Sequence, residues 1–166
     1  MNTKPIRGLI ALGALLVLGA VNFAIVAKER IRRDGETVYL DLAPVDPRSL
    51  MQGDYMALRF ALAQQLAQQL ERDDAPRRDG ETRVARVTLD AQRVGRLAST
   101  EAGSSAGVRL RYRIRGGQVW LGTNAFFFEE GSAERFNGAR YGEFRVDRES
   151  GEAVLVGLRD AALKPL

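Results

Sequence analysis

The chain has 166 residues, 45% of them hydrophobic, and a formal net charge of +4. It contains no histidine and no cysteine, which excludes a Ser-His-Asp triad, a thiolate nucleophile and the usual zinc, haem and iron–sulfur ligand sets. Arginines alternate with acidic residues instead of forming a block, so the sequence predicts no nucleic-acid partner. It also predicts no cofactor.

The first predicted element is an apolar helix over residues 8–27, in which Asn22 is the only strongly polar side chain. At 1.5 Å per residue, such a helix is about 30 Å long and matches the hydrocarbon core of a bilayer. We therefore predict a transmembrane anchor within residues 1–30 and one globular domain over residues 31–166. A cleaved signal peptide is the alternative, but the apolar run is longer than a typical signal core and ends in a poor cleavage site.

Basic residues flank this helix on both sides. Two precede it and four follow it: Lys4 and Arg7, then Lys28, Arg30, Arg32 and Arg33. By the positive-inside rule alone, this count places the globular domain in the cytoplasm by a small margin.

The globular part begins with a predicted strand over residues 37–42, where apolar and polar side chains alternate. Turns at Asp46-Pro47 and Gly53-Asp54 follow and lead into a second strand over residues 55–60. Strand alternation places Met56, Leu58 and Phe60 on one face of that strand, opposite Tyr55, Ala57 and Arg59.

A helix is predicted over residues 61–71, because Leu62, Leu66 and Leu70 recur every four residues. We expect this leucine stripe to face the core, since two turns are too short for a coiled coil. Strand pattern resumes over residues 83–89, and the pattern allows it to continue to residue 97.

Residues 109–115 alternate without a break between arginine and an apolar side chain. This predicts a half-buried strand with Leu110, Tyr112 and Ile114 facing the core and four arginines facing outwards. Gly116-Gly117 predicts a tight hairpin that returns through residues 118–121. The arginine row is interpreted as a solvated face paired with acidic residues, and the alternative is a surface for lipid phosphates or an acidic partner.

The remaining chain is predicted to form strands over residues 124–128, 141–146 and 153–158, with a helical turn over residues 132–139 capped by Ser132. A turn over residues 149–152 joins the last two strands. The predicted class is α+β: a single N-terminal transmembrane helix followed by one β-rich, mainly antiparallel domain of about seven strands with one or two short helices.

The segment Gly53-Asp54-Tyr55-Met56-Ala57-Leu58-Arg59-Phe60 resembles the signature of the GDYXXLXY family of bacterial membrane-anchored proteins. Residues 44–48 are similar to the family's lead-in, and residues 126–131, 139–147 and 157–158 are similar to its second block. Phe60 replaces the final tyrosine of the signature, which keeps the ring and loses its hydroxyl.

This resemblance implies a single-pass protein of the bacterial cytoplasmic (inner) membrane with its domain outside the cytoplasm, against the charge count. It also implies an association with multi-pass membrane proteins. It brings no activity, cofactor or catalytic residue with it.

The residues that we single out as motif or binding residues are Asp46, Pro47, Arg48, Gly53, Asp54, Tyr55, Leu58, Phe60, Phe128, Glu130 and Gly131. A turn that sets the register of the core sheet is the favoured interpretation of the motif, and a binding groove built by Arg48, Asp54, Tyr55 and Glu130 is the alternative.

Catalytic sites find little support in the sequence. Ser49 lacks a lysine partner nearby, because the only lysines are Lys4, Lys28 and Lys164. Glu129 and Glu130 would point to opposite faces of a strand, which argues against a carboxylate pair or a calcium site. We therefore predict no catalytic residue and no metal site.

The sequence hypothesis for function is a non-enzymatic accessory protein, held in the lipid bilayer by its N-terminal helix and acting with a multi-pass membrane protein. The alternative is a membrane-tethered small-ligand-binding or sensory domain, with a pocket between the motif loop and residues 126–131.

Overall fold

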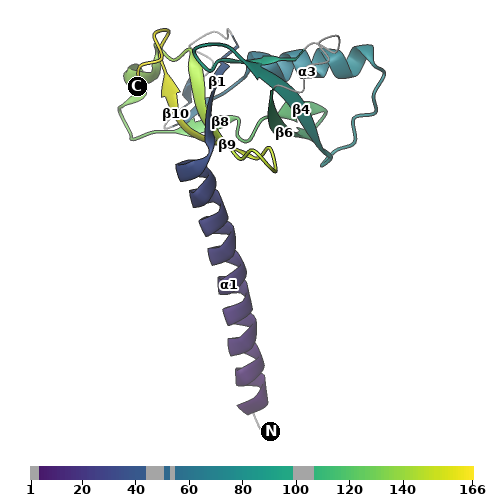
Figure 1. The fold of residues 1–166 in the computed structure, drawn as a ribbon. Helices are drawn as coiled ribbons and strands as arrows, with labels where there is room; N and C mark the ends of the chain where they lie inside the picture. Colours follow the sequence, from purple (N-terminus) through teal and green to yellow (C-terminus); the bar gives the residue numbers. More distant parts are fainter. Residues whose placement is uncertain (1–3, 44–50, 53–54, 99–106) are drawn as a thin grey trace.

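The protein consists of a long N-terminal helix that carries a β-rich domain at its C-terminal end (Figure 1). The computed structural model describes residues 4–43, 51–52, 55–98 and 107–166. The sheets in these ranges are antiparallel, and, besides the N-terminal helix, one α-helix and one 3-10 helix accompany them. The predicted α+β class is confirmed.

Helix α1 (Lys4–Asp34) is longer than the apolar run. Its side chains from Gly8 to Arg30 are exposed, and contact with the domain is confined to the last turns of the helix. Asn22 donates a hydrogen bond from Nδ2 to the carbonyl oxygen of Leu18 at 2.8 Å, which pairs the one polar amide of the run within the helix. By length and composition Gly8–Asp34 is long and apolar enough to cross a membrane, a property shared by single-pass anchors and signal sequences.

Only Gly35 separates α1 from the first strand, and the first sheet is built directly on this junction. The sheet has the order β1 (Glu36–Asp41), β9 (Tyr141–Val146), β10 (Ala153–Arg159). Glu36 lies opposite Val146, so the start of the domain pairs with a segment near its end. The pairing of β10 with β9 is irregular between Leu155 and Gly157.

A four-stranded sheet lies beside the first. Its order is β5 (Gly95–Leu97), β4 (Thr82–Leu89), β6 (Val108–Arg115), β7 (Gln118–Trp120). An isolated parallel bridge between Tyr39 and Val94 joins the two sheets. Gly116 and Gly117 have φ values of +54° and +75°, which confirms the predicted hairpin between β6 and β7.

The third sheet is small and contains the end of the motif. Its order is β2 (Met51–Gln52), β3 (Tyr55–Ala57), β8 (Ala125–Phe127). The backbone N–H of Leu58 donates to the carbonyl oxygen of Asn124 at 2.6 Å, which continues the contact between these segments beyond the ladder.

The hydrophobic core lies between the sheets and helix α3 (Ala61–Arg72). The leucine stripe of α3 is buried at Leu62, Leu66 and Leu70, as the periodicity predicted. The apolar face of β6 is also buried, whereas Arg109, Arg113 and Arg115 are exposed. Burial of these two faces supplies much of the driving force for folding.

Some sequence predictions need correction. The strand over residues 83–89 does not continue to residue 97, because Asp90 Oδ1 accepts hydrogen bonds from the backbone N–H groups of Gln92 and Val94, each at 2.9 Å. These bonds close a turn, and β5 then runs antiparallel to β4. The described residues form ten strands instead of about seven, since several pairings are only two or three residues long.

The predicted cap by Ser132 is also wrong. The helical turn exists as the 3-10 helix η1 (Ala133–Phe136), but the Ser132 side chain makes no capping hydrogen bond. Its hydroxyl donates instead to the carbonyl oxygen of Glu129 at 2.5 Å, which closes the preceding turn.

Candidate functional site

The motif strand β3 lies in the middle of the small sheet, and its two faces have different surroundings. Met56, 3% exposed, lies opposite Phe126, whose ring packs edge-on against Phe136 at 5.2 Å between centroids. On the other face Tyr55 lies opposite Phe127, with ring centroids 5.8 Å apart. Phe127 is 75% exposed. The sheet therefore buries one face and presents an aromatic pair on the other.

Two motif residues belong to the core. Leu58 and Phe60 are 3% and 1% exposed, as the predicted alternation requires. The Phe60 ring packs edge-on against Phe144 at 5.2 Å, and Phe60 is also the residue that precedes α3. Both side chains are therefore packed in the core and are not displayed on the surface of the domain. A phenylalanine suits this site, because a buried tyrosine hydroxyl would need a hydrogen-bond partner.

The next predicted site residues, Phe128, Glu130 and Gly131, follow strand β8. Phe128 is partly buried and packs against Phe136, with centroids 5.3 Å apart. Glu129 and Glu130 follow β8 in an exposed segment, so the expectation that they alternate along a strand was wrong. Gly131 has a φ of +78° and forms a turn. Within the described ranges, no group of three or more acidic side chains could hold a metal ion.

The remaining predicted motif residues are Asp46, Pro47, Arg48, Gly53 and Asp54, which lie outside the described residues. The predicted groove between Arg48, Asp54, Tyr55 and Glu130 therefore stays a prediction, as does a pocket between the motif loop and residues 126–131. Ser49 also lies outside the described residues.

A half-open pocket of about 300 Å³ does adjoin the end of the motif. Leu58, Arg59 and Phe60 form one side of it, and the first two turns of α3 and the strand β7 contribute further residues. Its place differs from that of the predicted pocket, because the chain leaves the β3 ladder after Ala57 and turns towards α3.

Sequence reasoning missed a buried charged residue in the second block. Glu143 is 6% exposed and accepts a hydrogen bond at Oε2 from Arg159 Nε at 2.7 Å. Arg159 Nη2 contacts the same oxygen, and Arg145 lies 3.8 Å from Oε1. Alternation of Phe144 and Val146 towards the core predicts an outward Glu143. Its burial depends on the pairing of β9 with β10, which no local pattern reveals.

No curated protein and no solved structure matches this chain. A family model described as GDYXXLXY protein matches residues 17–158, from within α1 to the end of β10. The match covers the motif strand, the small sheet and the buried Glu143, and with them most of the chain. The chain therefore belongs to the GDYXXLXY family.

Proposed function

We propose that this chain is a membrane-anchored, non-enzymatic accessory protein that binds a multi-pass membrane protein through the outer face of the β2–β3–β8 sheet. The observation that carries the proposal is the exposure of Phe127. Outside α1, the exposed large hydrophobic side chains of the described residues are Val84, at 45%, and Phe127, at 75%. An exposed aromatic side chain is typical of the centre of a protein interface.

A retained anchor is part of this proposal, and the junction of α1 with the domain supports it. Ile31, near the end of α1, is only 9% exposed, and Lys28 forms an ion pair with Glu152 in the β9–β10 turn. Cleavage after the apolar run would leave Lys28 and Ile31 in a helix of only about two turns, without the preceding residues that stabilise it. The last turns of α1 are thus integrated into the domain, which a removable signal sequence does not need.

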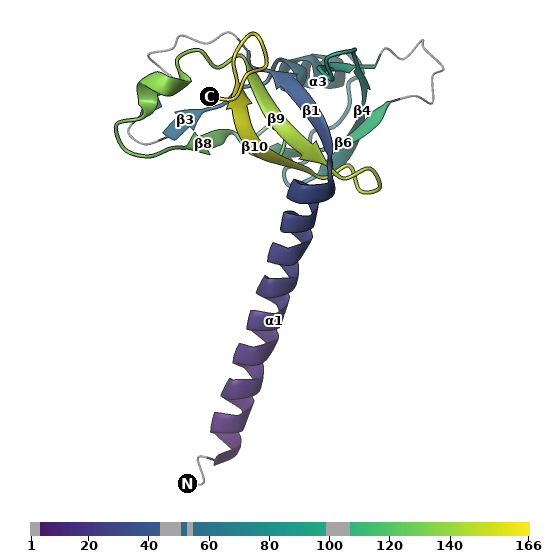
Figure 2. The same ribbon diagram turned by 60° about the vertical axis from the view of Figure 1, so that its left-hand side comes forward.

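The position of the small sheet fits a partner in the same membrane. In Figure 2 the sheet and η1 extend sideways from the axis of α1. A helix that crosses a bilayer near its normal would direct this end of the domain parallel to the membrane surface. A neighbouring membrane protein is then the partner that Phe127 reaches.

The test is co-purification of the tagged full-length chain in mild detergent, with retained proteins identified by mass spectrometry. We expect one multi-pass protein in stoichiometric amount, which Phe127→Ser abolishes. Val84→Ser is the matched control, because it removes an exposed hydrophobic side chain from β4 and should leave the partner bound. Purification of the chain alone, or equal retention by both variants, would contradict the proposal.

A small-ligand-binding domain is the second candidate, favoured by the pocket beside Leu58 and Phe60. Such a ligand would raise the melting temperature of the full-length chain in detergent, because it binds only the folded state. Ala63→Trp, placed at the pocket wall on α3, should abolish that shift. A ligand-induced shift together with the absence of any protein partner would favour this candidate over the accessory role.

A further inference from the structure

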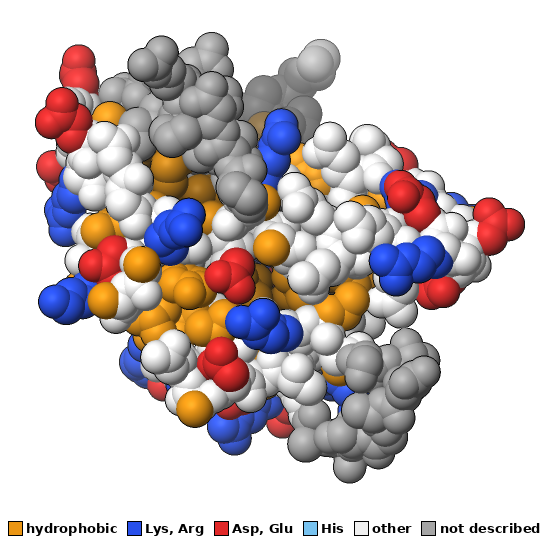
Figure 3. Space-filling view, turned by 90° about the horizontal axis from the view of Figure 1, so that it is seen from above, with side chains coloured by type: hydrophobic (Ala, Val, Ile, Leu, Met, Phe, Trp, Pro, Cys, Tyr) orange, Lys and Arg blue, Asp and Glu red, His pale blue; other side chains and the backbone are white. Residues whose placement is uncertain are grey.

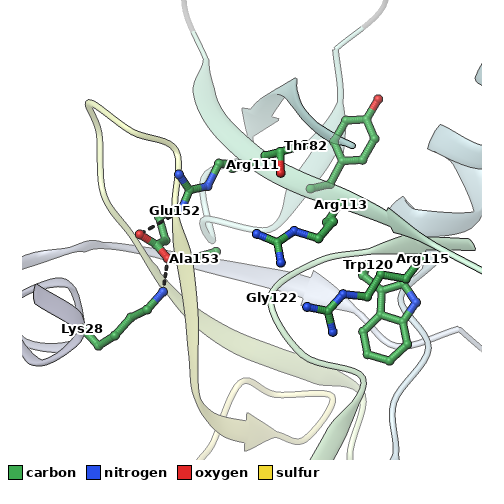
Figure 4. A pocket seen from close by; sticks show the side chains of 10 residues that line it. Lys28, Thr82, Arg111, Arg113, Arg115, Trp120, Gly122, Glu152 and Ala153 are labelled. Carbon is green, nitrogen blue, oxygen red and sulfur yellow. Dashed lines mark hydrogen bonds and ion pairs between the residues drawn. The ribbon is translucent and has the colours of Figure 1, made fainter. Parts of the chain in front are cut away.

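A second, chemically different site lies where α1 meets the four-stranded sheet. A pocket of about 190 Å³ opens between the end of α1, the strands β6 and β7, and the turn before β10. The side chains that give it its character are Lys28, Arg111, Arg113, Arg115, Trp120 and Glu152. Figure 4 shows Lys28 approaching from α1 and the three arginines projecting from β6 towards the same space.

Positive charge exceeds negative charge in this pocket. Glu152 is its one carboxylate, and it pairs with both Lys28 and Arg111, the latter at 2.9 Å. Arg115 lies over the Trp120 ring at 5.4 Å. Arg113 is exposed and forms no ion pair with a carboxylate within the part of the chain that the structure describes. Four cations thus surround one carboxylate, which leaves capacity for an anion.

The depth of the pocket relative to a bilayer follows from α1. Lys28 is the first charged residue after the apolar run of residues 8–27, so a bilayer that covers this run places Lys28 at the level of the lipid headgroups. Trp120 would lie in the same layer, where tryptophan is enriched in membrane proteins. On the face turned away from α1, basic and acidic side chains are interspersed (Figure 3).

We propose that this pocket binds the phosphate group of an anionic phospholipid in the leaflet beside the domain. The arginines of β6 supply donors for the phosphate oxygens, Lys28 adds charge from the anchor, and Trp120 covers the apolar part of the headgroup. The inference does not depend on a protein partner. The pocket lies on the face of the domain next to α1, and none of its residues belongs to the small sheet.

The chain itself offers the probe, since Trp120 is its only tryptophan. The full-length protein would be placed in nanodiscs of phosphatidylcholine that contain the same fraction of either brominated phosphatidylglycerol or brominated phosphatidylcholine. Bromine quenches nearby tryptophan fluorescence. We expect stronger quenching by the anionic lipid, and equal quenching by the two lipids would overturn the proposal.

Two variants distinguish a defined phosphate site in the pocket from general electrostatic attraction between the domain and the membrane. Arg113→Gln should remove most of the preference, since one basic residue beside an anionic membrane contributes about fivefold in affinity. Arg109→Gln is the matched control, because Arg109 lies in the same row of β6 but does not line the pocket. Equal losses in both variants would overturn the pocket as the site.

A last experiment tests whether the pocket binds the phosphate of a lipid or free inorganic phosphate. The wild-type protein in uncharged detergent would be titrated with inorganic phosphate while Trp120 fluorescence is recorded. We expect no saturable response at millimolar phosphate. A saturable response, together with the absence of a lipid preference, would assign the pocket to a soluble anion and overturn the lipid assignment.

Discussion

At the scale of single residues, the motif residue Phe60 packs closely against Gly142 of strand β9. A Cβ atom at Gly142 would lie 2.8 Å from Cε1 of Phe60 and 3.1 Å from both Leu155 Cδ1 and Phe144 Cε2. The motif phenylalanine thus occupies space that a glycine of the second block leaves open. The two residues are distant in sequence, and their contact joins the motif segment to strand β9.

This contact predicts that Gly142→Ala overpacks the core. The added methyl group must displace rings that are fully buried, and such overpacking costs about 1–3 kcal/mol of the free energy of unfolding. Thermal unfolding of the full-length chain in detergent, followed by circular dichroism, measures the loss. Gly138→Ala is the control, because no atom lies within 4 Å of the site of its Cβ. Equal melting temperatures for the two variants would contradict the predicted clash.

The buried Tyr112 predicts how the stability of the folded state changes at high pH. Burial raises the pKa of its phenol above the ordinary value of 10.0, against the opposing effect of the Arg83 charge. The folded state therefore favours the protonated phenol. Its contribution to stability is complete below the unfolded pKa and is lost as the pH rises through the higher folded pKa.

Absorbance at 295 nm against pH measures this titration. In the folded full-length chain we expect a tyrosine step above pH 10 that is missing in Tyr112→Phe. In guanidinium chloride the step should move down to the ordinary value, because the unfolded chain no longer buries the ring. If Tyr112→Phe instead removes a step at pH 10 or below, the raised pKa of Tyr112 would be refuted.

At the scale of elements, the sequence predicts those whose pattern is local. The leucine stripe of α3 and the alternation of β6 each specify which side faces the core, and the Gly116-Gly117 turn fixes the β6–β7 register. The break between β4 and β5 was missed because it depends on Asp90, whose side chain bonds the backbone of the turn. The partner strands β1 and β9 are about 100 residues apart, and alternation alone cannot choose between such pairings.

The same limit applies to the candidate sites. Tyr55, Leu58 and Phe60 were assigned to the correct faces of the motif strand because period-two alternation is local. The exposure of Phe127, the buried Glu143 and the convergence of Lys28 with the β6 arginines all depend on tertiary contacts. No pattern within a single segment could have indicated them.

The junction between α1 and β1 carries the prediction at this scale. A Cβ atom at Gly35 would lie 2.4 Å from the carbonyl oxygen of Ile31 and 3.0 Å from the backbone nitrogen of Val146. Both obstacles are backbone atoms, so a side-chain rotation cannot relieve them. Gly35→Ala should therefore lower the melting temperature of the full-length chain by several degrees. Gly157→Ala, whose added methyl group meets no atom within 4 Å, should have a much smaller effect.

At the scale of the whole molecule, the orientation in the membrane is open to a direct test. We expect the domain outside the cytoplasm, as the family resemblance implies and the charge count opposes. The chain has no cysteine, so a single introduced thiol reports its own side of the membrane. Gln92→Cys lies in the exposed turn between β4 and β5 and should react with an impermeant maleimide in intact cells.

The matched control for orientation is Asn2→Cys, on the other side of the apolar run. It should react only after the cells are permeabilised. Reaction of Asn2→Cys but not of Gln92→Cys in intact cells would reverse the orientation. Reaction of both in intact cells would indicate that the helix does not cross the membrane.

The single residue between α1 and β1 has a consequence for how such a protein meets others. A domain on a flexible linker must lose both translational and rotational freedom when it docks, which weakens association. With α1 held in a bilayer, as proposed, diffusion is already confined to two dimensions, and the glycine junction fixes the tilt of the domain on its helix. Spinning about the helix axis is then the main orientational search that remains, and each turn carries Phe127 around a circle of constant height above the bilayer.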